Sequence, residues 1–166
     1  MTALITACKR ENEKIIQFLI DRGSDVNQVD GKGHTPLNVA CIGGNEKIIQ
    51  FLIDRGCVDC MIQTPLFNGN GDTPLTITCM TENEKIVKLL IDKEVDVNKV
   101  NADGETPLTI SCCVGNEKIV QLLIEKGCDV DKVDANGDTP LTLSRMLENE
   151  KIVQLLIAKE LMRQVM

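Results

Sequence analysis

The segment that decides the fold is DGKGHTPLNVACIGGNEKIIQFLIDRG, residues 30–56. Pro36 opens a first helix, because proline at the first helical position lacks only an N–H that would have no partner within the helix. Asn45 is a suitable cap for a second helix, and Glu46 lies in its first turn, where the helix dipole favours negative charge. Gly56 can adopt the left-handed conformation that ends this helix. The segment therefore predicts a short helix, a turn and an amphipathic helix.

Two markers repeat with the same spacing along the chain. The tetrapeptide Asn-Glu-Lys-Ile recurs at intervals of 33, 38, 33 and 33 residues, at Asn12, Asn45, Asn83, Asn116 and Asn149. A Thr-x-Leu marker keeps the same intervals, at Thr2, Thr35, Thr73, Thr106 and Thr139. Neither helix would be stable alone, but stacked pairs bury a continuous core. We therefore expect an all-α solenoid with one domain over residues 1–166, whose five helix-turn-helix repeats span about 1–29, 30–67, 68–100, 101–133 and 134–166.

The stretches between repeats are polar and rich in turn-forming residues, and we expect them to project as β-hairpin loops. The interval of 38 indicates that one loop, within residues 57–72, is five residues longer than the others. This loop is either a finger that contacts a partner through Met61, Ile62 and Phe67, or a tolerated surface insertion. The second alternative is reasonable because a longer loop adds only about a few tenths of a kcal/mol in closure entropy.

The repeat resembles the ankyrin repeat family over nearly the whole chain. The matching residues are Asp30 to Gly33, Thr35 to Leu37, Ala40, Gly44 and Ile48 to Ile53, with further matches at Asp103 to Leu108 and Asp134 to Leu141. Two features depart from the family pattern. The usual His after Thr-Pro-Leu is replaced at four positions, Asn38, Thr76, Thr109 and Thr142, which predicts a weaker polar anchor. Glu94 and Glu160 replace the helix-ending Gly, which costs about 1 kcal/mol where the backbone stays left-handed.

Composition argues against several classes of function. The net charge is −7, whereas a nucleic-acid-binding surface needs a basic stripe, so we expect no nucleic-acid partner. No apolar run approaches the roughly 18 residues that span a bilayer, so we expect no membrane partner. Eight Cys without a signal peptide favour a reducing compartment, which predicts a cytoplasmic, intracellular protein.

The sequence offers little for catalysis, metal binding or a cofactor. Cys57-x-x-Cys60 is the one Cys pair with metal or redox spacing, but it follows a helix instead of opening one, and the single His34 lies a loop away. Four other cysteines share one repeat position and are expected to pack as small hydrophobes: Cys8, Cys41, Cys79 and Cys112. A row of lysines, each following a Glu, is expected to be a mixed solvated face: Lys14, Lys47, Lys85, Lys118 and Lys151. We therefore expect no enzyme, no metal and no cofactor.

The resemblance implies a surface for a partner protein or peptide, made by the ends of the first helices and the loop tips. The helix row is Lys9-Arg10, Ile42-Gly43, Met80-Thr81, Cys113-Val114 and Met146-Leu147, and the tip row is His34, Asp72, Glu105 and Asp138. Phe67 in the long loop is a further candidate. An apolar floor with an acidic rim suits an amphipathic segment that carries Lys or Arg. The alternative is that the apolar residues only pack against neighbouring first helices.

The remaining alternatives concern the end of the chain and the role of the whole molecule. The apolar tail of Leu161, Met162, Val165 and Met166 either covers the last repeat or reflects a longer array. The principal functional hypothesis is a monomeric, non-enzymatic protein-binding module or scaffold. A structural spacer within a larger protein is the alternative, and a metal or redox site at Cys57 and Cys60 is a further one.

Overall fold

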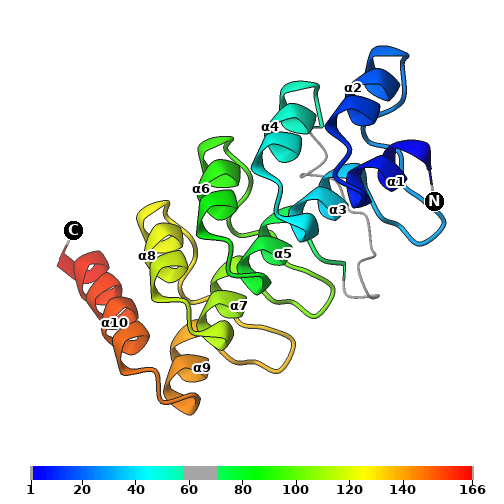
Figure 1. Cartoon of the computed structure of the whole chain (residues 1–166). Helices are drawn as coiled ribbons and strands as arrows, with labels where there is room; N and C mark the ends of the chain where they lie inside the picture. Colours follow the sequence, from blue (N-terminus) through cyan, green and yellow to red (C-terminus); the bar gives the residue numbers. More distant parts are fainter. Residues whose placement is uncertain (1, 58–70, 166) are drawn as a thin grey trace.

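The chain folds into two parallel rows of helices. The computed structural model describes residues 2–57 and 71–165, and in these residues ten helices follow one another in five pairs. The first helices of the pairs form one row and the second helices form the other (Figure 1). The pairs are α1 (Ala3–Lys9) with α2 (Glu13–Asp21), α3 (Pro36–Gly43) with α4 (Glu46–Asp54), α5 (Pro74–Met80) with α6 (Glu84–Asp92), α7 (Pro107–Val114) with α8 (Glu117–Glu125), and α9 (Pro140–Met146) with α10 (Glu150–Val165). This arrangement confirms the expected all-α solenoid.

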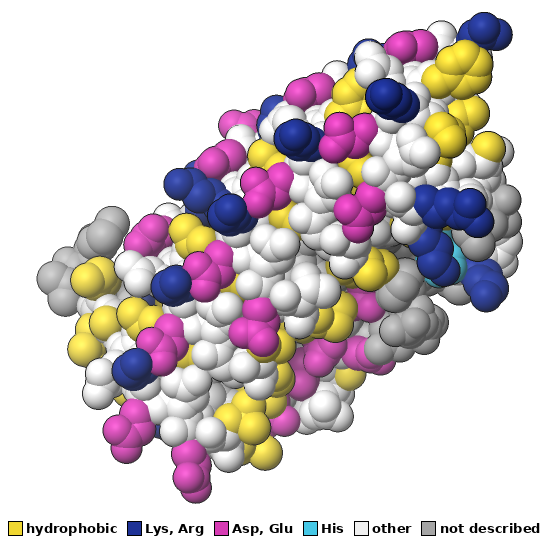
Figure 2. Space-filling model, viewed as in Figure 1, with side chains coloured by type: hydrophobic (Ala, Val, Ile, Leu, Met, Phe, Trp, Pro, Cys, Tyr) yellow, Lys and Arg dark blue, Asp and Glu magenta, His cyan; other side chains and the backbone are white. Residues whose placement is uncertain are grey.

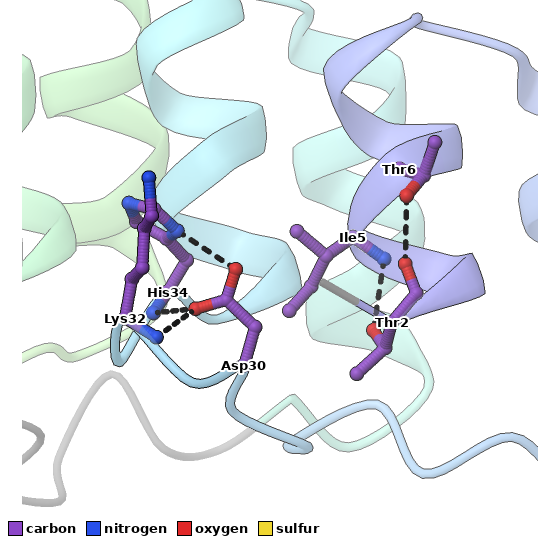
Figure 3. Close-up of polar contacts among 6 residues, drawn as sticks. All are labelled: Thr2, Ile5, Thr6, Asp30, Lys32 and His34. Atoms are coloured by element: carbon purple, nitrogen blue, oxygen red, sulfur yellow. Dashed lines mark hydrogen bonds and ion pairs between the residues drawn. The ribbon is translucent and has the colours of Figure 1, made fainter.

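Threonine caps position every first helix. Thr2 Oγ1 accepts the N–H of Ile5 at 3.2 Å at the start of α1 (Figure 3), and Thr35 does the same for α3. At α5 the contact is reciprocal, because the N–H of Thr73 also donates to Thr76 Oγ1 at 2.7 Å. The same reciprocal contact opens α7 and α9. Thr76 therefore supplies a polar anchor of its own, which the expectation of a weakened anchor missed.

The core lies between the rows and is built from small aliphatic side chains. The repeated cysteines are part of it: Cys8, Cys41, Cys79 and Cys112 are at most 1% exposed. Burial raises the pKa of the Cys79 thiol to about 12 and that of Cys8 to about 12, so both stay protonated at neutral pH. They fill space as small hydrophobes, as expected for a packing role.

The loops before the first helices end in tight turns. Backbone hydrogen bonds close them, such as Asn101 N–H to Glu105 O at 3.0 Å and Gly104 N–H to Asn101 O at 3.1 Å, and no residue in 2–57 and 71–165 lies in a strand. Projecting loops are present, but the expected β-hairpin strands are not seen there. Adjacent turns approach closely: a Cβ on Gly104, whose φ is +74°, would lie 3.0 Å from the Ala135 nitrogen. The lengthened loop, with Met61, Ile62 and Phe67, lies outside the described residues.

The two glutamates expected to end second helices behave differently. Glu94 has φ +60° and follows Lys93, the C-cap of α6, so the left-handed conformation persists there. Glu160 lies inside α10, which continues to Val165, so the left-handed conformation of the family's helix-ending Gly does not occur at this residue. Helix α10 consequently has 16 residues, whereas α8 has 9. Leu161 and Met162 are exposed on this extension, so they do not fold back over the last repeat.

Candidate protein-binding surface

The projecting turns lie on the side of the molecule formed by the first helices, away from the row of second helices (Figure 1). Each first helix begins just after a turn and ends at the connection to its second helix. The predicted tip row and the predicted helix row therefore occupy opposite ends of the same short helices. Each repeat contributes a pair to the helix row, and the second to fifth repeats each contribute one residue to the tip row.

The helix row is exposed, as the binding hypothesis requires. Its apolar side chains have large exposed fractions: Ile42 40%, Met80 43%, Val114 38%, Met146 71% and Leu147 53%. Thr81 and Cys113 in the same row are also exposed. The alternative that these residues only pack between neighbouring first helices does not fit such exposure. They form a discontinuous apolar row across α3, α5, α7 and α9.

His34, the first residue of the tip row, is held by a buried aspartate. Asp30 Oδ2 lies 2.9 Å from His34 Nδ1, and its other oxygen accepts the backbone N–H groups of Lys32 and His34 (Figure 3). The Asp30 side chain is only 2% exposed. Burial opposes ionisation of this carboxyl, but the bonds from the His34 side chain and the two N–H groups outweigh it and lower the pKa of Asp30 to about 2. Asp30 thus organises the turn that presents Lys32 and His34.

Asp72 was expected to belong to an exposed acidic rim, but its side chain is buried. It is 5% exposed, and its Oδ1 accepts a hydrogen bond from Asn101 Nδ2 at 3.1 Å. Its backbone oxygen accepts another from Asn38 Nδ2. Burial raises the pKa of this carboxyl. Asp72 therefore links three successive repeats and does not present its carboxylate to a partner.

The accessible acidic groups are instead on the last two turns. Glu105 and Asp138 are half-buried, as is Asp134, and Asp103 is exposed. Burial raises the pKa of the Cys113 thiol, and the carboxylates of Glu105, Asp134 and Asp138 raise it further. These turns therefore act electrostatically on the helix row at α7. Sequence reasoning missed Asp103 and Asp134, because it considered only the residue directly before each Thr-Pro.

The second helices present a different kind of surface. Each lysine of the repeated Glu-Lys pair in α6, α8 and α10 contacts the Glu of the preceding repeat: Lys85–Glu46 at 3.6 Å, Lys118–Glu84 at 3.3 Å and Lys151–Glu117 at 3.1 Å. These ion pairs form one ladder between neighbouring repeats. A second ladder of ion pairs joins Arg55 to Asp21 at 2.7 Å and Lys93 to Asp54 at 3.0 Å. The lysine row is thus the mixed, solvated face that the sequence predicts. Exposed pairs of this kind contribute at most about 1 kcal/mol each.

The described residues offer no site for metal chemistry. Cys57 is buried and its thiol donates to the Val26 carbonyl, whereas Cys60 lies outside the described residues. Within residues 2–57 and 71–165, no three His, Cys, Asp or Glu side chains are grouped so that they could hold a metal ion. In the same part of the chain, no helix has the length and hydropathy needed to cross a bilayer.

Comparison with known families accounts for the repeated helix pairs. A family model described as ankyrin repeats (3 copies) matches residues 1–64 and 56–134, and another, ankyrin repeats (many copies), matches residues 114–157. The chain belongs to the ankyrin repeat family. A search of curated proteins gives no match. Ankyrin repeats generally mediate protein–protein interaction and are typically non-enzymatic.

Proposed function

We propose that this ankyrin repeat protein is a non-enzymatic binding module that holds a partner protein or peptide on the exposed ends of its first helices and on its loop tips. The observation that carries the proposal is the apolar row of Ile42, Met80, Val114, Met146 and Leu147. Full burial of such a side chain contributes about 1.5–3 kcal/mol, so two or three of them supply a useful part of a binding energy.

The side chains of the apolar row can adapt to the shape of a partner. Met80 and Met146 have flexible, polarizable side chains that adjust to irregular partner surfaces. The turns beside the row carry Asp103, Glu105, Asp134 and Asp138. An apolar strip next to carboxylates favours a basic, amphipathic helix or an extended peptide as the partner.

The ion-pair ladders give the second-helix face a role in stacking, which leaves the first-helix face for a partner. A structural spacer would need no dedicated apolar row, so we do not favour that alternative. Five described cysteines have free thiols, which supports a reducing compartment, and we propose the cytoplasm: Cys8, Cys79, Cys112, Cys113 and Cys128. We further propose that the protein acts as a monomer.

The test is affinity capture from source-cell lysate with wild type and the double variant Met80→Glu, Met146→Glu. Both residues are exposed, so the substitutions should leave the fold intact, as circular dichroism will check. The matched control is Ile15→Glu, Phe18→Glu, which changes two exposed apolar residues of α2. We expect wild type and control to capture a common protein that the methionine variant loses. If all three forms capture the same protein equally, the proposed surface is wrong.

A further inference from the structure

Charge is distributed unevenly along the proposed binding surface. Residues 1–57 contain 7 Lys and Arg and 7 Asp and Glu, whereas residues 58–166 contain 11 and 18. The imbalance therefore lies in the later repeats. On the surface itself, exposed cations gather at one end of the apolar row and carboxylates gather at the other.

The end formed by the first two repeats is basic. Lys9 and Arg10 are exposed at the end of α1, and Lys32 is exposed on the turn before α3. Figure 2 shows Lys and Arg side chains gathered beside the histidine in this region. The acids beside these cations are Asp30, whose ionised side chain is buried against His34, and the exposed Glu11, which accepts a hydrogen bond from Asn45 of the next repeat. The three exposed cations outnumber these two acids at this end of the surface.

The end formed by the last two repeats is acidic. Asp103, Glu105, Asp134 and Asp138 lie on the turns before α7 and α9, and the exposed Glu148 follows α9. Figure 2 shows acidic side chains grouped beside hydrophobic ones farther along the molecule.

Fewer cations face this acidic group. The Lys99 ammonium is buried, so it does not face the surface. The cations that oppose the carboxylates are the exposed Lys132 on the last loop and Arg145 on α9. Negative charge therefore predominates at this end.

The middle of the surface is mainly apolar, although the exposed Glu82 follows the Met80-Thr81 pair. Ile42 and Met80 lie between the two charged ends, and Val114 lies at the end of α7. We propose that the bound segment is itself polarised: carboxylates at one end lie over α1 and the turn before α3, apolar residues cover the middle, and Lys or Arg at the other end face the turns before α7 and α9. This inference rests on the proposed function and adds the orientation of the partner.

Electrostatics would fix the orientation and not only the affinity. A polarised segment bound the wrong way round would place like charges together at both ends, which disfavours that orientation. A uniformly basic segment would gain attraction at the last two repeats but meet Lys9, Arg10 and Lys32 at the other end. The two charged regions lie in different repeats, and the Debye length is only about 8 Å at physiological ionic strength, so each end acts largely by itself.

Three synthetic peptides of about 20 residues test this inference, because a helix of that length spans about 30 Å. All share one apolar stripe. The first carries Glu in its N-terminal third and Lys in its C-terminal third, the second carries only Lys at these positions, and the third carries only Glu. Fluorescence anisotropy measures the affinity for the full chain, and a nitroxide at the Glu-bearing end of the first peptide reports its orientation by broadening nearby amide signals in NMR spectra.

We expect the polarised peptide to bind about 5- to 10-fold more tightly than the other two, because several weak exposed charge pairs act together. We expect the nitroxide to broaden signals of α1 and residues 31–34. Equal affinity of the polarised and all-Lys peptides, or broadening at both ends of the surface, would overturn the inference but leave the proposed function standing. Binding by none of the three would contradict both.

Charge reversal on the protein supplies the matched control. The variant Lys9→Glu, Arg10→Glu should weaken binding of the polarised peptide and strengthen binding of the all-Lys peptide. The variant Lys14→Glu, Lys88→Glu makes the same charge change on exposed residues of the second helices. It should leave both affinities within about twofold, because these charges lie away from the proposed surface. Equal effects of the two variants would show that net charge, not its placement, controls binding, and would contradict the inference.

Discussion

Asp30 shows how a single residue shapes the surface that the protein presents. Its carboxylate accepts three hydrogen bonds from Lys32 and His34 and has very little exposed area. The sequence motif indicated a turn here, because Asp is common where a side chain binds the backbone two residues on. The motif did not predict that Asp72 is buried, because this burial depends on a contact with Asn101 of the next repeat. Local motifs predict local turns, but a contact between repeats depends on both partners.

The contribution of Asp30 to stability should depend on pH. Its pKa is about 2 in the folded protein, below the ordinary value of 3.8, so the folded state favours the ionised form. The stabilisation is therefore complete above the ordinary value and disappears as the pH falls toward 2. Urea unfolding of wild type and Asp30→Asn across this range should show a difference in the free energy of unfolding at pH 7 that shrinks in acid. A difference independent of pH would contradict this account.

The second helices show how far repeat spacing predicts an element. Their starts follow from the Asn caps, and each described cap from α2 to α8 accepts the expected N–H bond. Their ends do not follow from spacing alone. Glu94 and Glu160 occupy the same repeat position, yet the chain turns at the first and continues as a helix at the second. After Glu94 the chain must enter the next loop, whereas α10 extends and is tied by Arg163 to Asp131 at 2.6 Å.

One substitution at these two positions should have opposite effects. Glu94→Gly relieves a left-handed glutamate and should stabilise the protein by about 1 kcal/mol. Glu160→Gly places glycine inside α10 and should destabilise it by about 1 kcal/mol. The measurement is the urea midpoint of each variant, with helical content from circular dichroism. A shift of the same sign for both would show that the backbone conformation does not govern these sites.

At the scale of the whole molecule, each repeat is stabilised by its neighbours. Ile15 is 48% exposed in the first repeat, whereas the equivalent Ile48, Ile86 and Ile119 are at most 2% exposed. The sequence repeats this isoleucine identically in every unit, so its burial is set by the presence of a preceding repeat and not by local pattern. The solenoid was predictable from the period, and the exposure of each copy required the stacked structure.

Stability should therefore reside mainly in the interior repeats. Ile119→Ala removes buried methyl groups and should cost about 2–5 kcal/mol of unfolding free energy. Ile15→Ala should cost less than about 1 kcal/mol, because half of that side chain is already exposed. Equilibrium denaturation of both variants provides the comparison. Similar losses for the two would argue against stacking as the main source of stability.

The most direct test of the binding surface is a photo-crosslinking side chain placed at Met80 in one sample and at Lys88 in another. Both positions are exposed in the same repeat, Met80 at the end of α5 and Lys88 on α6. In source-cell lysate, the Met80 position should form a covalent adduct with a distinct protein and the Lys88 position should not. An adduct formed mainly or equally from Lys88 would place the partner on the second helices and contradict the central claim.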